Sequence, residues 1–235
     1  MNNEMRVHQF DNGVKVYDEH LLPLQKKRYA TNNIHEPEEE VIFKEIINDL
    51  RKFEAYYDIG AAVGYYPILA RMMRPKDIII RAFEPLPSQM LRMQQNIALN
   101  GLEYDDISLH AEAISNTEGT AQLADLSYAS FIVENQAAPN KPTVNVKTNT
   151  LDLFAKQANE SIGLLQIDVQ GHEIKVLKGA TNCMWEKRIR HILVGTHGPG
   201  IHELCLQILV TRGYKIEFEN FETADQPDGI IHARY

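Results

Sequence analysis

Four residues suited to acid–base or hydrogen-bonding chemistry each follow a short apolar run. They are Asp58, Glu84, Asp168 and His197. The apolar runs are typical of buried parallel strands. In a parallel sheet the carboxyl ends of the strands lie along one edge, where ligands bind. The sequence therefore predicts that these four side chains meet at one end of a sheet.

The loop after the first run has two glycines at an informative spacing. Asp58, Gly60 and Gly64 form an Asp-x-Gly-x-x-x-Gly pattern. A dinucleotide-binding turn needs Gly-x-Gly-x-x-Gly/Ala. That template places Ala62 at the second glycine and Tyr65 at the third small position, and both fit poorly, which disfavours a dehydrogenase. The spacing resembles the cofactor loop of class I methyltransferases, with Asp58, Gly60, Ala62 and Gly64 at the cofactor. The alternative is an ordinary strand–helix turn.

An acid also ends the second apolar run. Glu84 follows Asp58 by about 26 residues, near the position at which such an acid meets the ribose hydroxyls of an adenosine ligand. A carboxylate suits this task because it accepts hydrogen bonds from two adjacent hydroxyls. We predict that Glu84 and Pro85 contact the ribose, and that Glu112 and Ala113 lie near the adenine. The alternative for Glu84 is a surface acid.

The composition is that of an ordinary globular protein. The 235 residues are 44% hydrophobic and 24% charged, enough for one α/β domain with a substantial core. The net charge of −8 disfavours a broad phosphate-binding surface, so we expect no nucleic-acid partner. Cys183 and Cys205 fit a reducing compartment. Because we find no signal peptide and no run of about 18 apolar residues, we expect a cytoplasmic protein with no membrane partner.

Apolar runs alternate with helical patterns along most of the chain. We predict strands at 55–59, 78–83, 107–110, 162–169, 192–195, 214–219 and 230–234, with helices at 37–52, 88–100 and 200–212 among others. This order predicts an α/β fold: a mostly parallel seven-stranded sheet with helices on both faces and an antiparallel C-terminal strand pair. Together with the loop at Asp58, it resembles the Rossmann-like fold of class I methyltransferases. Residues 120–123 and 143–147 alternate like exposed antiparallel strands. The polar loop between them, with Ser130, is predicted to cover the substrate.

Residues 1–52 are predicted to form an N-terminal extension that packs on a core domain, 53–235. Residues 14–17 are typical of a short strand after a turn. The basic triplet at 26–28 is interpreted as a solvated loop. Pro37 precedes three glutamates, which is typical of a helix start. We interpret this helix as a cover for a sheet edge.

Several short motifs of the sequence resemble those of the FkbM family of S-adenosylmethionine-dependent methyltransferases. They are Asp58-Ile59-Gly60-Ala61-Ala62-Val63-Gly64-Tyr65-Tyr66, Ala82-Phe83-Glu84-Pro85, Ala113-Ile114-Ser115 with Gly119, Thr150-Leu151-Asp152, and Ile167-Asp168-Val169-Gln170-Gly171-His172-Glu173. The resemblance covers about 53–235. It implies S-adenosyl-L-methionine as cofactor and methyl transfer, usually to a hydroxyl of a small molecule or a sugar. The family usually has Glu where this chain has Gln170, which keeps a hydrogen-bonding group but has no base capacity.

Methyl transfer to an alcohol removes the hydroxyl proton, so a nearby base helps. Asp168 and His197 are the predicted catalytic residues, the histidine because its unperturbed pKa lies near neutrality. Asp168 is also a candidate cofactor contact, and an N-cap for the helix that begins near His172 is an equal alternative. The predicted acceptor contacts are Ser130, His172, Thr196 and His197. We expect no metal, because His197 and His202 lack an organised third ligand.

The predicted function is O-methylation of a small molecule or sugar. Two alternatives stay open: a non-catalytic S-adenosylmethionine-binding module, which Gln170 favours, and a methyltransferase that acts on a macromolecule. The strand that ends at Asp168 lacks the Asn/Asp-Pro-Pro-Tyr/Phe motif of enzymes that methylate amino groups of DNA, which argues against that class. The chain is also compatible with a homo-oligomer.

Overall fold

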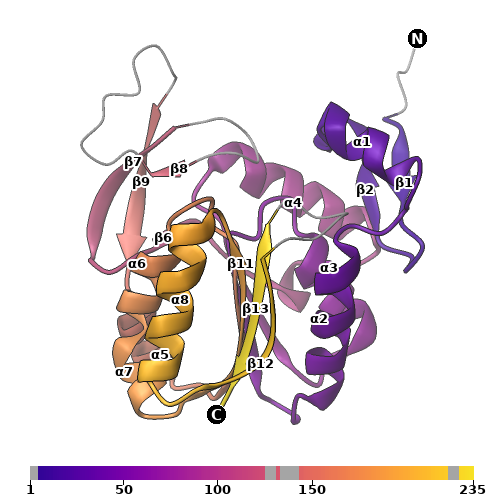
Figure 1. The fold of residues 1–235 in the computed structure, drawn as a ribbon. Coiled ribbons are helices and arrows are strands. Elements are labelled where there is room, and N and C mark those ends of the chain that lie inside the picture. The colour runs from indigo at the N-terminus through magenta and orange to yellow at the C-terminus, as the bar shows by residue number, and fades with distance from the viewer. Residues whose placement is uncertain (1–4, 125–130, 133–142, 222–227) are drawn as a thin grey trace.

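The computed structural model describes residues 5–124, 131–132, 143–221 and 228–235, and within them seven strands form the central sheet (Figure 1). Their order is β12-β13-β11-β10-β3-β4-β5. They span β3 Ala55–Ile59, β4 Ile79–Phe83, β5 Ser108–His110, β10 Ile162–Ile167, β11 Ile189–Thr196, β12 Lys215–Asn220 and β13 Gly229–Arg234. Only β13 runs antiparallel to its neighbours in this sheet, β11 and β12. The predicted mostly parallel sheet with an antiparallel C-terminal pair is confirmed.

Helices cover both faces of the sheet, as the alternating pattern predicts. One face carries α2 Pro37–Asp49, α3 Tyr65–Met73 and α4 Pro87–Leu99, and the other carries α5 Leu151–Ala158, α6 Glu173–Gly179, α7 Thr181–Trp185 and α8 Pro199–Thr211 (Figure 1). Proline begins α2, α4 and α8, where its missing N–H leaves no helical hydrogen bond unmade. The sheet edge that carries the strand ends is therefore held between two helical layers.

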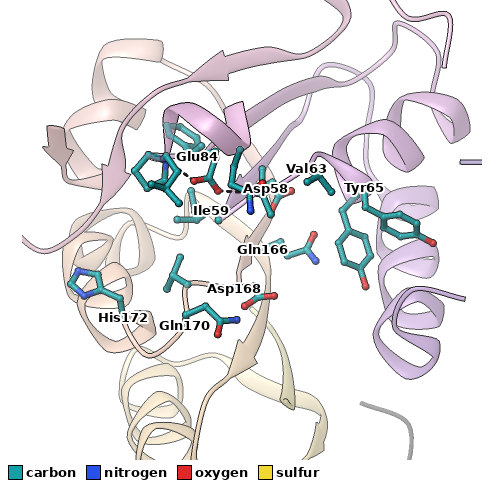
Figure 2. Close-up of a pocket in the computed structure, with 18 of the residues that line it drawn as sticks. Asp58, Ile59, Val63, Tyr65, Glu84, Gln166, Asp168, Gln170 and His172 are labelled. Atoms are coloured by element: carbon teal, nitrogen blue, oxygen red, sulfur yellow. Dashed lines mark hydrogen bonds between the residues drawn. The ribbon is translucent and has the colours of Figure 1, made fainter. Parts of the chain in front are cut away.

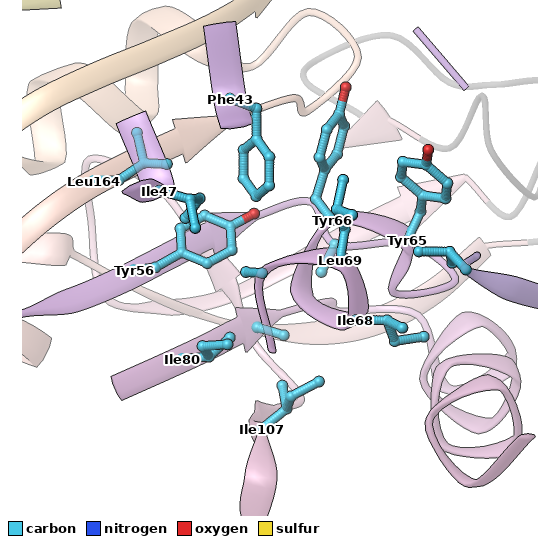
Figure 3. Packing of buried hydrophobic residues seen from close by; sticks show 14 of the residues in the cluster. Phe43, Ile47, Tyr56, Tyr65, Tyr66, Ile68, Leu69, Ile80, Ile107 and Leu164 are labelled. Atoms are coloured by element: carbon cyan, nitrogen blue, oxygen red, sulfur yellow. The ribbon is translucent and has the colours of Figure 1, made fainter. Parts of the chain in front are cut away.

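Aromatic side chains fill the core under α2 and α3. The ring of Phe43 on α2 lies 5.4 Å from that of Tyr56 on β3 and 4.7 Å from that of Tyr66 on α3, centroid to centroid (Figure 3). The same cluster includes Phe10 and Val14 from the N-terminal segment. Burying each such side chain contributes about 1.5–3 kcal/mol. The N-terminal segment and the sheet domain therefore share one hydrophobic core.

The N-terminal segment begins with a hairpin of β1 Val7–Gln9 and β2 Lys15–Tyr17, followed by the short 3-10 helix η1 Asp18–His20 and α1 Pro23–Tyr29. The interpretation of 26–28 as a solvated loop is wrong, because these residues form the last turn of α1. Basic side chains are favoured there by the negative end of the helix dipole. Arg28 also donates to the backbone carbonyl of His35 at 2.7 Å, which ties α1 to the start of α2.

A second, smaller sheet contains β6 Ala113–Ile114, β7 Gly119–Ala124, β8 Phe131–Ile132 and β9 Thr143–Asn149. β7 and β9 pair antiparallel, as their alternating pattern predicts. Ser130 and most of the polar loop lie outside the described residues, so the predicted substrate cover stays a prediction. Among the residues that the structure describes, no helix is long and apolar enough to cross a membrane.

Candidate functional site

A cavity of about 400 Å³ opens at the carboxyl ends of β3, β4 and β10 (Figure 2). Its volume falls within the range of roughly 300–1,000 Å³ of small-molecule sites. The predicted site residues that line it are Asp58, Gly60, Ala62, Glu84, Pro85, Glu112, Ala113, Asp168 and His172. The parallel sheet therefore brings together acids that lie far apart in the sequence.

Gly60 allows the loop after β3 to pass directly against the end of β10. Its φ is +93°, and a Cβ atom there would lie 1.9 Å from the backbone oxygen of Asp168. Gly64 also has positive φ, +85°, and caps α3 against Met93 of α4 instead of lining the cavity. Gly60 therefore shapes the cavity wall, whereas Gly64 sets the start of the following helix.

Glu84 holds this loop and faces the cavity at the same time. Its Oε2 accepts from the backbone N–H of Ala62 at 3.0 Å, and its Oε1 accepts from that of Leu86 at 2.8 Å (Figure 2). Burial raises the pKa of this carboxyl to about 7, although both hydrogen bonds oppose the shift. Each oxygen keeps a second lone pair. The carboxylate is thus fixed in position and still able to accept from two hydroxyls.

The methionine end of the predicted cofactor site is rich in acids. Burial raises the pKa of Asp58 to about 8, Tyr56 opposes the shift, and the carboxylates of Glu84 and Glu36 raise the pKa further. Such carboxyls gain from a positive charge among them. S-adenosylmethionine has a positive sulfonium and an ammonium group, so the residues present fit that cofactor.

Asp168 follows β10 and lines the cavity. Its Oδ1 is shielded from solvent and has no hydrogen-bond partner among the described residues. The N-cap of α6 is His172, so the alternative role of Asp168 as that cap is wrong. Burial raises the pKa of Asp168 well above its usual range, and His197 opposes the shift. This carboxyl is the best-placed acid–base group on the cavity wall.

His197 lies behind Asp168 and outside the set of residues that line the cavity. Its Nε2 is 3.6 Å from Oδ1 of Asp168 and 3.3 Å from Oδ1 of Asp228. Its Nδ1 is 2.7 Å from Oε1 of Glu173. Burial lowers the pKa of His197, but Glu173, Asp168 and Asp228 outweigh burial and raise the pKa to about 9. The catalytic role of His197 stays a prediction, and its surroundings favour the charged imidazolium over the neutral base.

The remaining predicted acceptor residues have structural partners. The hydroxyl of Thr196 lies 2.7 Å from Nδ1 of His202 and donates to the backbone carbonyl of Gly229, and Thr196 does not line the cavity. His202 also lies 2.9 Å from Glu219, and within the described part of the chain it has no partner in common with His197. His172 does line the cavity, with its Nε2 2.9 Å from Oγ of Ser115. Of these residues, only His172 is placed to meet a ligand.

Several residues that line the cavity were not predicted from the sequence. Asp228 precedes β13, Glu36 precedes α2 and accepts from the Tyr66 hydroxyl at 2.9 Å, and Arg28 comes from α1. Nothing in their local sequence indicates a site.

Gln166, which also lines the cavity, could have been found from the sequence, because an amide inside a buried strand requires hydrogen-bond partners. The Tyr56 hydroxyl donates to it at 2.6 Å, and it donates to Glu39 at 2.8 Å.

Comparison with known proteins places the chain in a family. The model of the methyltransferase FkbM domain matches residues 58–218. The chain therefore belongs to the FkbM family of S-adenosylmethionine-dependent methyltransferases. The methyltransferase sdnD of Sordaria araneosa is 28% identical over 244 residues, which cover 88% of this chain and 92% of that protein. The 31-O-demethyl-FK506 methyltransferase FkbM of Streptomyces tacrolimicus is 24% identical over 202 residues, 70% of this chain and 77% of that one.

Solved structures show the same fold. A methyltransferase FkbM from Methylobacillus flagellatus KT matches with a TM-score of 0.57 at 16% identity over 79% of this chain, which spans only 44% of that longer chain. The magnesium protoporphyrin IX methyltransferase of Synechocystis PCC 6803, solved with S-adenosylmethionine bound, matches with a TM-score of 0.54 at 11% identity, over 91% of this chain and 85% of that one. The predicted Rossmann-like methyltransferase fold is confirmed.

Proposed function

We propose that this protein transfers a methyl group from S-adenosylmethionine to a hydroxyl group of a small molecule or a sugar. The observation that supports this most is the buried carboxyl of Asp168 at the wall of the cavity. Its Oδ1 accepts no hydrogen bond from the residues that the structure describes and has only the longer contact with His197. The relative from Streptomyces tacrolimicus is a 31-O-demethyl-FK506 methyltransferase, which supports oxygen as the methylated atom.

The cofactor would be held along the strand ends. The turn at Gly60 and the carboxyl of Asp58 would meet its methionine end, Glu84 would accept from the ribose hydroxyls, and Glu112 and Ala113 would flank the adenine. When bound, S-adenosylmethionine supplies a methyl group on a positively charged sulfur. The acids around the cavity stabilise positive charge there, and the turn at Gly60 sets where the ligand can approach the backbone.

Asp168 would accept the proton of the acceptor hydroxyl. A carboxyl whose pKa is raised is a stronger base than an ordinary aspartate, which suits proton removal from an alcohol. Because His197 lies behind Asp168, it would act on the charge of Asp168 and not on the acceptor itself. Much of the rate would come from holding the two reactants in line and away from water.

The N-terminal extension, 1–52, would form the acceptor side of the site on the core domain, 53–235. Leu24, Gln25 and Arg28 of α1 line the cavity, and Leu24 is 80% exposed. An apolar residue beside a guanidinium suits a small organic acceptor with polar groups. We propose a small-molecule partner and not a nucleic acid, and the net charge of −8 supports this.

The test is methyl transfer followed by mass spectrometry. The protein is incubated with trideuteromethyl S-adenosylmethionine and a panel of sugars, hydroxylated small molecules, primary amines and RNA. We expect the label on oxygen of a hydroxylated compound, and loss of transfer in Asp168→Asn with binding of S-adenosylhomocysteine retained. Label on nitrogen or RNA alone, or full transfer by Asp168→Asn, would contradict the proposal.

A further inference from the structure

His197 is surrounded by carboxylates that come from different elements. Asp168 follows β10, Glu173 begins α6, and Asp228 precedes β13, and each has an oxygen within 3.6 Å of a ring nitrogen. The side chain of His197 is 16% exposed. An imidazole that meets acids on both ring nitrogens is suited to holding a positive charge.

Glu173 fixes the orientation of this ring. Its side chain is fully buried, and its Oε1 lies 2.7 Å from Nδ1 of His197 and accepts from the backbone N–H of Gly171 at 3.0 Å. With Nδ1 engaged by Glu173, Nε2 turns toward Asp168 and Asp228. A buried carboxylate is costly unless it is paired and hydrogen-bonded, so the pair with His197 gives Glu173 its counter-charge.

We propose that Glu173 is a positioning residue that holds His197 as a buried imidazolium, and that this cation keeps Asp168 ionised to accept the proton of the acceptor. The role of Asp168 rests on the proposed function. The charge on His197 does not, and it can be measured without any acceptor.

The charges around the pair favour this arrangement. Glu36, Asp228 and Glu173 each raise the pKa of Asp168, and His197 lowers it. Burial raises the pKa of Asp228, and His197 and a second cation, Arg28, oppose that shift. From α8, Cys205 lies near Glu173. Burial raises the pKa of the Cys205 thiol, and the charge of Glu173 raises it further. Without the charge on His197, mutual repulsion and burial would drive a proton onto one of the acids.

Gln170 lies against the same ring. Its side-chain nitrogen is 2.7 Å from Nε2 of His197, and a rotation of the amide by 180° brings its oxygen to that place. The oxygen is the group that accepts from an imidazolium. In that orientation the amide hydrogen-bonds the cation without adding another negative charge.

Nuclear magnetic resonance of histidine-labelled protein tests the charge directly. The signals of His197 are assigned by their loss in His197→Asn. We expect His197 to titrate near its pKa of about 9, and to titrate at a pH about 1 lower, or lower still, in Glu173→Gln. Asp228→Asn should give a smaller change in the same direction and serves as a second variant, should Glu173→Gln fold poorly. Glu219→Gln, which alters only the partner of His202, should leave His197 unchanged.

A wild-type His197 that is neutral at neutral pH, or one whose titration does not move in either variant, would overturn the proposal. The pH profile of methyl transfer tests the second half. His197→Asn removes the cation outright, so the acid limb of kcat/KM should move to higher pH in that variant. At any pH below both limbs its kcat/KM falls about tenfold when the limb moves from pH 6 to pH 7, for example. An unmoved limb in His197→Asn would overturn the link to Asp168. Failure of S-adenosylmethionine to bind would overturn the proposed function and leave the titration result in place.

Discussion

Replacing Glu84 by glutamine should weaken the binding of 5′-methylthioadenosine and remove most of the pH dependence of that binding. This compound keeps the adenine and ribose of the cofactor but lacks its titratable amino group. Burial raises the pKa of the Glu84 carboxyl to about 7, and the ionised form is the one that accepts from two hydroxyls. If binding selects that form, the affinity of the wild-type protein should fall about tenfold from about pH 8 to about pH 6.

Glutamine offers one oxygen where glutamate offers two. It cannot accept from the backbone N–H of both Ala62 and Leu86, as Glu84 does, and it presents an N–H₂ group to one ribose hydroxyl. Loss of one hydrogen bond to a charged group costs about 1.5–3 kcal/mol. The affinity of Glu84→Gln should therefore be about 10- to 150-fold lower than that of the wild type at about pH 8, with little further change toward acid.

Calorimetric titration across this pH range measures both effects. Glu118→Gln, on an exposed turn, is the matched control and should bind as the wild type does. The reasoning would be refuted by a wild-type affinity that does not change with pH, or by a Glu84→Gln protein that binds as tightly as the wild type.

Three further predictions concern the loop and the stability of the fold. Gly60→Ala should abolish binding of S-adenosylhomocysteine in calorimetry, because the added Cβ would lie 1.9 Å from a backbone oxygen, whereas Gly200→Ala, with nothing within 4 Å, should bind normally. Arg190→Met should lower the free energy of unfolding in urea by about 3–5 kcal/mol, because Glu54 would lose its partner in a buried ion pair; a loss under about 1 kcal/mol would contradict this. Burial, with a smaller contribution from Arg190, lowers the pKa of His191 from 6.5 to about 4. As the pH falls, the histidine of the unfolded chain is therefore protonated before that of the folded protein. The free energy of unfolding should decrease as the pH drops from 6.5 to about 4. His191→Asn should flatten that slope.

Much of the fold follows from local patterns in the sequence. The apolar runs predict β3 and β4, and the edge rule for parallel sheets predicts that Asp58, Glu84 and Asp168 lie together. β11 is longer than predicted, because Arg190 and His191 interrupt its apolar pattern. Both are buried in the strand and have partners on another element, including Asp49 at the end of α2. Such tertiary partners cannot be read from local sequence.

The candidate site was less predictable than the fold. Strand ends indicate which residues approach the cavity, but Thr196 and His197, at the end of β11, still turn away from it, toward His202 and Glu173. Their direction depends on how α6 and α8 pack beside them. Arg28 comes to the cavity through α1, whose position depends on the packing of the N-terminal segment. Because the residues in these contacts lie far apart in the sequence, local sequence patterns do not predict them.

The most direct test of the methyltransferase account is calorimetric titration of the purified protein with S-adenosylmethionine, S-adenosylhomocysteine and NAD. We predict that the first two bind, that Gly60→Ala abolishes and Glu84→Gln weakens the binding of both, and that NAD does not bind. Binding of NAD without either sulfur compound would contradict the account. So would binding of S-adenosylmethionine that both variants leave unchanged, because the ligand would then occupy another site.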